Sequence, residues 1–197
     1  MKINKKKFLY LISPNKILKS FYGELIQVLK SNKISFFQLR LKKDNFKNKL
    51  KIAKKIKKIC NKFKVKLLIN DDPILAVRIN ADGCHLGQKD MDINSARKLL
   101  KNKIIGMTCH NSIKLAKIAI KNNADYIAFG AFNTSMTKKV KYKASINLIK
   151  QIKKTSNIPV IAIGGINNLN YKKLLLNKAD FLAISGYIWN NKKLKPV

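Results

Sequence analysis

Short runs of apolar residues, many of them β-branched or aromatic, alternate along the chain with longer segments in which apolar residues recur at helical spacing. This alternation predicts strands separated by helices. One helix is predicted over 45–63, where Ala53 and Ile56 share a face opposite lysines. Another is predicted over 111–121, with Asn111 as its amino-terminal cap. The predicted strands are 8–12, 34–41, 65–70, 83–87, 104–107, 126–130, 159–163 and 181–185.

A repeated motif supports this count of strands. Ala-Asp, an apolar strand and then Gly occur in that order at 81–87, 124–130 and 179–186, at predicted strands four, six and eight. Near-continuous apolar strands between helices are typical of a parallel sheet covered by helices. Eight of them predict an α/β fold, a single-domain (β/α)8 TIM barrel over 1–197 with a short C-terminal helix. An open doubly wound sheet is the alternative, but its usual glycine-rich first turn is replaced here by Ser13-Pro14-Asn15.

The charge is strongly unbalanced, with 43 Lys and Arg against 9 Asp and Glu and a formal net charge of +34 over 197 residues. Clustered cations suit nucleic acid, but nearly all of these are lysines spread along the chain, and only Arg40, Arg78 and Arg97 are arginines. We interpret them as a solvated surface that binds polyanions weakly, with no specific nucleic-acid partner. Because 46% of the residues are hydrophobic, the chain can still build a core.

The sequence shows no membrane or disulfide signature. No apolar run approaches the roughly 18 residues of a membrane-spanning helix, and the apolar stretch near the amino terminus is too short for a signal peptide. Cys60, Cys84 and Cys109 have neither C-x-x-C spacing nor an even count, which indicates reduced thiols rather than disulfides or a zinc site. We therefore expect a cytoplasmic protein without a membrane partner; an oligomer is compatible with the sequence.

Acidic residues are scarce, yet five of the nine fall between residues 71 and 92. Helix caps and turns explain such aspartates in one interpretation, and a divalent-cation site explains them in the other. In (β/α)8 barrels the active site lies at the carboxyl ends of the strands. Asn70, Asp71 and Asp72 follow predicted strand three, and Asp90 follows strand four, so the sequence brings carboxylates to that rim.

Strand two brings cationic groups to the same rim. Gln38, Arg40 and Lys42 alternate, which predicts that all three point inward, where a buried row of this kind needs an anion or acids. Arg and Lys beside paired carboxylates suit a Mg²⁺-bound di- or triphosphate, since the carboxylates bind the metal and the cations bind the remaining oxygens. Salt bridges across the barrel mouth are the structural alternative.

A second anion site is predicted on this rim. The loop over 130–139 is rich in hydroxyls and ends in lysines, and glycines follow strands seven and eight, where such barrels commonly bind phosphate through backbone N–H groups. His85 and His110 have no carboxylate or Cys at metal-ligand spacing, so structural or supporting roles are predicted for both.

Six motifs occur in order at the predicted strand ends: Gln38-x-Arg40-x-Lys42, Asn70-Asp71-Asp72, Ala81-Asp82-Gly83-x-His85-Leu86-Gly87-Gln88-x-Asp90, Gly106-x-Thr108-x-His110, Ser135-x-Thr137-Lys138 and Ala162-Ile163-Gly164-Gly165-Ile166. Together they cover about residues 10–188 and resemble the thiamine-phosphate synthase family. The resemblance implies a (β/α)8 transferase that joins 4-amino-2-methyl-5-hydroxymethylpyrimidine diphosphate to 4-methyl-5-(2-hydroxyethyl)thiazole phosphate. Thiamine phosphate and pyrophosphate would be the products.

The resemblance also implies roles for individual residues. Asp71 and Asp90 would hold Mg²⁺, and Arg40, Lys42 and Lys138 would be catalytic. The pyrimidine diphosphate would be bound by Gln38, Arg40, Lys42, Asn70, Thr108 and Lys138, and the thiazole phosphate by Ser135, Met136, Thr137, Gly165, Ile184 and Ser185. The family mechanism is dissociative, with pyrophosphate leaving before the thiazole nitrogen attacks. This agrees with the lack of an obvious nucleophile or general base in the sequence.

The chain departs from the family pattern at two places: Thr108 stands where Ser is usual, and Asn133-Thr134 stands where Phe-Pro is common. A related thiazole tautomerase is an alternative, but it typically has a catalytic His where this chain has Ala131, and it tends to lack the glutamine present here as Gln38. A lysine-rich polyanion-binding protein is a further alternative, which leaves the carboxylate cluster unexplained.

Overall fold

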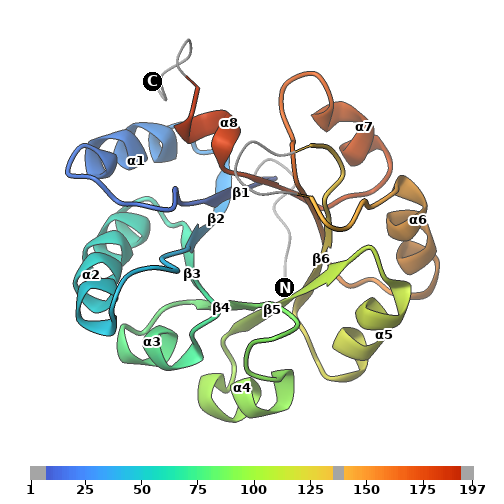
Figure 1. Cartoon of the computed structure of the whole chain (residues 1–197), viewed down its shortest axis with the longest axis horizontal. Helices are drawn as coiled ribbons and strands as arrows, with labels where there is room; N and C mark the ends of the chain where they lie inside the picture. Colours follow the sequence, from blue (N-terminus) through green and yellow to red (C-terminus); the bar gives the residue numbers. More distant parts are fainter. Residues whose placement is uncertain (1–7, 135–139, 192–197) are drawn as a thin grey trace.

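The computed structural model describes residues 8–134 and 140–191. Eight parallel strands pair in sequence order, and β1 also pairs with β8, so the sheet closes into a barrel surrounded by helices (Figure 1). The predicted (β/α)8 barrel is confirmed, including its short last helix. The strands are β1 (Leu9–Ile12), β2 (Ile34–Leu39), β3 (Lys66–Asn70), β4 (Gly83–Leu86), β5 (Ile104–His110), β6 (Tyr126–Gly130), β7 (Val160–Ile163) and β8 (Phe181–Ile184).

Each strand is followed by a helix that packs its apolar face on the sheet. In the longest helix, the predicted apolar face is confirmed, since Ala53, Ile56 and Cys60 are buried while most of its lysines are exposed. The helices are α1 (Phe21–Lys30), α2 (Phe46–Lys62), α3 (Pro73–Arg78), α4 (Ile93–Leu100), α5 (Ile113–Lys121), α6 (Ile146–Thr155), α7 (Tyr171–Leu176) and α8 (Gly186–Trp189).

The predicted amino-terminal cap of α5 is wrong by one residue. Strand β5 extends to His110, with an irregular register between Thr108 and His110, so the helix cannot begin at residue 111. Ser112 is the amino-terminal cap, and its hydroxyl accepts the Leu115 N–H at 3.2 Å. The Asn111 side chain instead donates to the carbonyl of Lys143 at 3.4 Å, which ties the loop after β5 to the segment before α6.

The inside of the barrel is filled by large side chains, among them Tyr10, Phe36, Tyr126 and Phe181, which are at most 3% exposed. The Tyr126 ring occupies the place that a side chain of Gly106 would take, because a Cβ there would lie 1.8 Å from the ring. A glycine in β5 is therefore required by the packing of β6. The barrel is a packed core rather than a channel.

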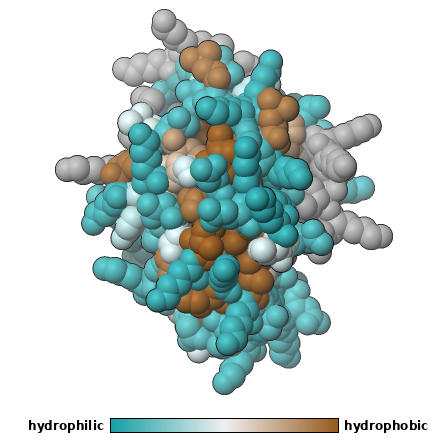
Figure 2. All heavy atoms as spheres, turned by 90° about the vertical axis from the view of Figure 1, so that its right-hand side faces the viewer, coloured by the Kyte–Doolittle hydropathy of each residue, from teal (hydrophilic) through white to brown (hydrophobic). Residues whose placement is uncertain are grey.

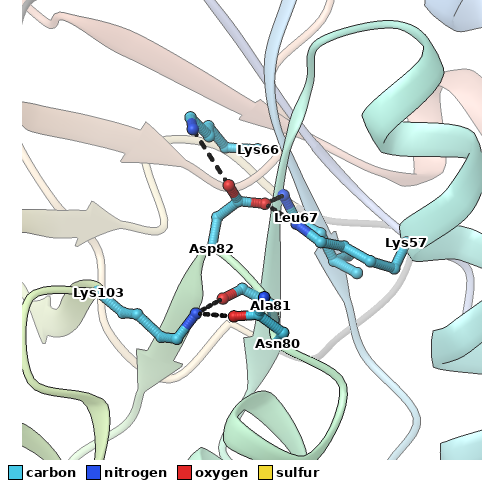
Figure 3. Close-up of polar contacts among 7 residues, drawn as sticks. All are labelled: Lys57, Lys66, Leu67, Asn80, Ala81, Asp82 and Lys103. Carbon is cyan, nitrogen blue, oxygen red and sulfur yellow. Dashed lines mark hydrogen bonds and ion pairs between the residues drawn. The ribbon is translucent and has the colours of Figure 1, made fainter.

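The three repeated Ala-Asp motifs lie at the amino-terminal ends of β4, β6 and β8. Asp82 accepts the Leu67 N–H of β3 at 2.9 Å and pairs with Lys57 of α2 at 2.6 Å, with Lys66 on its other oxygen (Figure 3). The same arrangement recurs elsewhere: Asp125 binds the Ile105 N–H and Arg97, and Asp180 binds the Val160 N–H and Lys153. Each aspartate thus joins two neighbouring strands and the helix that precedes the first of them.

The outer surface is dominated by lysine. Figure 2 shows the side carried by α5, α6 and α7, where hydrophilic side chains surround smaller hydrophobic areas. In the part of the chain that the structure describes, no helix is long and apolar enough to cross a membrane. Cys60, Cys84 and Cys109 are free and buried.

We expect Asp82→Ala to lower the free energy of unfolding by about 2 kcal/mol, because the Leu67 N–H and the largely buried Lys57 ammonium lose their acceptor. Asp82→Asn retains an acceptor for Leu67 and should recover part of this loss. Urea unfolding at neutral pH measures both effects. Equal stability of wild type and Asp82→Ala would contradict this role.

The stability contributed by the Asp82 charge depends on pH in a defined direction. Burial acts to raise the pKa of Asp82, but hydrogen bonds from Lys57 and the Leu67 N–H lower it overall. Because the folded pKa is lowered, the contribution is full above the unfolded value of about 3.9 and is lost as the pH falls through the folded value. The stability difference between wild type and Asp82→Asn should therefore shrink below about pH 4.

Candidate active site

Polar side chains gather around a cavity of about 330 Å³ at the carboxyl ends of β2 and β3. Lys42 follows β2, Asn70 ends β3, and Asp71 and Asp72 come directly after it. Lys49, from the first turns of α2, lines the same cavity and is half-buried. The predicted meeting of cations and carboxylates on one rim is present in the structure.

Asp71 and Asp90 lie against one another at this rim. Their carboxyl groups share a hydrogen bond, and the Lys42 ammonium lies 3.0 Å from Asp71. Burial acts to raise the pKa of Asp71, but the hydrogen bonds from Asp90 and Lys42 lower it overall. Burial and the neighbouring Asp71 raise the pKa of Asp90. Two carboxylates this close repel one another when both are ionised, and a cation bound beside them relieves that repulsion.

The donor set around this pair fits Mg²⁺. Asp90 also accepts the Gly87 N–H at 2.7 Å, which orients its carboxyl group, and Asp71 stands at a left-handed φ of 64° directly after β3. Among the described residues, no group of three or more His, Cys, Asp or Glu side chains is placed to hold a metal. A site with two carboxylates suits Mg²⁺ that completes its shell with water and substrate phosphates, rather than a closed zinc or calcium site.

Other aspartates of the 71–92 cluster have structural roles, so the interpretation by caps and turns applies to part of the cluster. Asp72 caps α3 by accepting the Leu75 N–H at 2.9 Å, and Asp92 caps α4 by accepting the Ser95 N–H at 3.0 Å. Asp82 serves the strand contacts described above. Only Asp71 and Asp90 direct their carboxyl groups toward each other.

The predicted inward row of Gln38, Arg40 and Lys42 is wrong for two of its members. Strand β2 ends at Leu39, because the Arg40 N–H donates to the Ser13 hydroxyl at 2.9 Å and the chain leaves the sheet. The Arg40 guanidinium then reaches Asn15 at 2.5 Å, and the Lys42 side chain is 54% exposed. Gln38 alone is buried, with its Nε2 donating to the Tyr10 hydroxyl at 2.9 Å.

Thr108 lies on β5 beside His85. Its hydroxyl is 2.8 Å from Nε2 of His85, and Gln88 donates to its backbone carbonyl at 2.5 Å. Burial lowers the pKa of His85 to about 4, so this ring is neutral at neutral pH. The predicted supporting role of His85 agrees with this position inside the barrel.

The predicted second anion site is described only in part. Ser135, Met136, Thr137 and Lys138 lie outside the described residues. Gly165 follows β7 at a φ of 60°, and a Cβ there would lie 2.0 Å from the Thr134 carbonyl, so this glycine admits the loop after β6. Ile184 ends β8, and the Ser185 hydroxyl donates to the Ser13 carbonyl at 3.3 Å.

A family model of thiamine monophosphate synthase matches residues 9–188, nearly the whole chain. The chain belongs to the thiamine monophosphate synthase family. A curated thiamine-phosphate synthase of Pelagibacter ubique (strain HTCC1062) is 70% identical over all of this chain and 97% of its own length. One from Nitrosococcus oceani is 35% identical over 95% of this chain and 87% of its own. The resemblance seen in the motifs is confirmed, and with it the expected class of enzyme, a transferase.

Solved structures agree with this family. A thiamine phosphate pyrophosphorylase from Pyrococcus furiosus superposes with a TM-score of 0.85 at 27% identity, over 96% of this chain and 90% of its own. An orotidine 5'-phosphate decarboxylase from Pyrococcus horikoshii superposes with a TM-score of 0.64 at 13% identity over 94% of this chain and 93% of its own, which shows a shared fold alone.

Three residues near the family motifs escaped the sequence analysis. Lys49 is one of many lysines in α2, and only its helical phase relative to the buried Ala53 and Ile56 places it toward the rim. Tyr10 and Tyr126 look like ordinary apolar strand residues, and their hydroxyls meet only because the barrel closes.

We expect two neighbouring substitutions at this site to separate fold from function. Asp72→Ala should lower the free energy of unfolding by about 1 kcal/mol, because α3 loses its cap. Asp71→Asn should change it by less than about 0.5 kcal/mol, because the Lys42 partner of its ion pair is 54% exposed and asparagine tolerates the left-handed φ. Urea unfolding of both variants checks this, and a larger loss for Asp71→Asn would make Asp71 a structural residue.

Proposed function

We propose that this chain catalyses the Mg²⁺-dependent joining of hydroxymethylpyrimidine diphosphate to hydroxyethylthiazole phosphate, with release of pyrophosphate. The observation that carries the proposal is the paired carboxyls of Asp71 and Asp90, beside Lys42 on a rim that also holds Arg40 and Asn70. A diphosphate with a divalent cation is the ligand that uses both kinds of group. The family and its curated relatives supply the reaction class.

The diphosphate end of the substrate would bind along the cavity. Asp71 and Asp90 would hold Mg²⁺, which neutralises charge on the departing pyrophosphate. Lys42 and Lys49 would bind the outer phosphate oxygens, and Asn70 would donate its amide to the same group. Arg40 follows β2 at this rim, where its N–H donates to the Ser13 hydroxyl and its guanidinium donates to the Asn15 side chain. Lys138 is proposed as a further cation for the diphosphate on the basis of its motif.

The pyrimidine ring would lie deeper, against Gln38 on β2, and Thr108 on β5 would face the diphosphate where it joins the ring. Both side chains are anchored on their inner side, by Tyr10 and His85 respectively, so their outer atoms would face the ligand. The thiazole phosphate would take the opposite part of the rim, with Gly165, Ile184 and Ser185 and the segment of Ser135, Met136 and Thr137.

The rim is suited to a dissociative reaction. The chemistry asks the protein to stabilise a leaving polyanion and to align two substrates, rather than to supply a nucleophile. Lys42, Arg40 and Lys49 bring cationic side chains to the rim where the charge would develop. We also propose the cytoplasm as the location, on the strength of three free, buried thiols.

The decisive assay is formation of thiamine phosphate from the two substrates, with Mg²⁺ and with EDTA. We expect product only with Mg²⁺, and we expect Asp71→Asn and Asp90→Asn each to lower kcat/KM by about a hundredfold or more, because each removes one of the two metal ligands. Asp92→Asn is the matched control, since it changes an exposed carboxylate two residues from Asp90 that caps α4.

Three outcomes decide the assignment. Full activity in either Asp71 or Asp90 variant would remove the metal site from this pair. Product formation in EDTA would remove the metal requirement. If folded wild-type protein forms no product, a thiazole tautomerase is favoured instead. An assay for conversion of one thiazole carboxylate phosphate tautomer into the other would then test that activity.

Lys49 should contribute to binding of the diphosphate. We expect Lys49→Met to raise KM for the pyrimidine diphosphate about tenfold with little change in stability, because one charge-assisted contact is lost from a half-buried position. Lys47→Met, on the exposed face of the same helix, controls for the reduced net charge. Equal KM values for the two variants would mean that Lys49 acts only through the general positive field.

A further inference from the structure

A chain of hydrogen bonds crosses the inside of the barrel and joins side chains from five strands. Gln38 Nε2 donates to the Tyr10 hydroxyl at 2.9 Å, and the Tyr10 and Tyr126 hydroxyls are 2.9 Å apart. The Tyr126 hydroxyl is 2.8 Å from Nδ1 of His85, whose Nε2 is 2.8 Å from the Thr108 hydroxyl. The chain thus begins at one proposed pyrimidine-binding residue and ends at another.

Donor and acceptor chemistry gives this chain a single direction. An amide Nε2 can only donate, so every proton of these bonds meets an acceptor within the chain only where the Tyr10 hydroxyl donates to the Tyr126 oxygen. The Tyr126 proton must then go to Nδ1 of His85, which places the imidazole proton on Nε2. That proton is donated to the Thr108 oxygen. The Thr108 hydroxyl proton is then available to a group that is not part of these hydrogen bonds, such as a ligand.

We propose that Tyr126 is a positioning residue that couples Gln38 to Thr108, so that the site favours a ligand that donates at Gln38 and accepts at Thr108. The inference rests on the proposed function for the identity of that ligand. If the Gln38 amide turned over, every bond of the chain would reverse and Thr108 would become an acceptor toward the ligand. The two ends therefore cannot be set independently.

The proposed substrate has the matching groups. The exocyclic amino group of the pyrimidine donates and suits the side-chain carbonyl of Gln38, while diphosphate oxygens accept and suit the Thr108 hydroxyl. A ring with an oxo group in place of the amine would present an acceptor at Gln38 and oppose this direction. Through these hydrogen bonds, residues that do not contact the amine contribute to the discrimination between amino- and oxo-pyrimidines.

Packing holds Tyr126 where the coupling needs it. Its ring stacks on His85, with centroids 5.6 Å apart and planes 13° apart, and it lies over Gly106 with no room for a Cβ. Tyr10 and Tyr126 are at most 1% exposed, so water does not compete for their hydroxyls. Among the described residues, no buried side-chain nitrogen or oxygen lacks a hydrogen-bond partner.

The direction of the chain can be measured without substrate. The protein contains two histidines, so long-range ¹H–¹⁵N NMR spectra of the full chain, assigned with His110→Asn, report the tautomer of His85. We expect Nε2 to carry the proton in wild type at neutral pH and the tautomer to become mixed in Tyr126→Phe, which removes the donor to Nδ1. A wild-type ring protonated on Nδ1 would overturn the proposed direction.

The coupling is tested by kinetics in two backgrounds. In the wild-type background we expect the combined loss in kcat/KM of Gln38→Leu and Thr108→Val to be about tenfold smaller than the product of the single losses, because both break one chain. In Tyr126→Phe the two losses should multiply. Tyr126→Phe should also lower kcat/KM for the amino-pyrimidine diphosphate by about ten- to a hundredfold. The oxo analogue, tested as a competitive inhibitor, should then bind more tightly relative to the amino substrate than it does in wild type.

Controls separate this coupling from general damage and from failure of the proposed function. Tyr22→Phe removes a hydroxyl on the outer helix α1 and should leave the kinetics unchanged. Where Tyr126→Phe does not fold, Tyr10→Phe cuts the chain at its other hydroxyl and takes its place. Losses that multiply in both backgrounds would overturn the coupling. If wild type makes no thiamine phosphate, the proposed function fails, while the NMR result still decides the direction of the chain.

Discussion

The position of every rim residue depends on the register of the parallel strands, and aspartates at the opposite end of the barrel hold that register. Asp82, Asp125 and Asp180 each accept a backbone N–H from the strand before their own and an ion pair from the helix before that strand. Because successive residues of a strand point to opposite faces, a slip of one residue would exchange core and helix-facing side chains. Contacts far from the site thereby set which residues reach it.

The strong excess of lysine makes each carboxylate more consequential than in a balanced protein. With 43 cations against 9 acids, every acid can find a cation, yet most serve a specific geometric purpose. Three join strands, two cap helices and two meet at the rim. The lysines, by contrast, mostly face solvent, and among the few that are partly buried, Lys57 and Lys153 are paired with strand-joining aspartates. The excess charge is a property of the exterior and leaves the barrel interior unaffected.

The alternation of strands and helices, the closed barrel and the carboxylate pair could be predicted because each leaves a local trace in the sequence. The Ala-Asp repeat marks strand starts, and Asp71 and Asp90 follow strand ends by fixed short distances. The departure of Arg40 from the inward row could not, since it depends on a hydrogen bond from its N–H to the hydroxyl of Ser13, which follows β1. Lys49 could not be predicted for a different reason. Lysines occupy several faces of α2, so the sequence does not distinguish the one that points toward the rim. Contacts that exist only after closure leave no periodic signal.

Polar atoms of Tyr10, Tyr126 and His85 lie in the part of the barrel where apolar side chains would cost less free energy to bury. Burying such groups is unfavourable unless each donor meets an acceptor, and a partly satisfied set is worse than an apolar core. This cost is avoided only because the hydrogen bonds continue without a gap from Gln38 to Thr108, which lie where the interior meets the rim. A purely structural core would have no need of such a chain, since leucine or phenylalanine would fill the same volume. Its continuity therefore ties the packing of the core to the orientation of the residues that face the ligand.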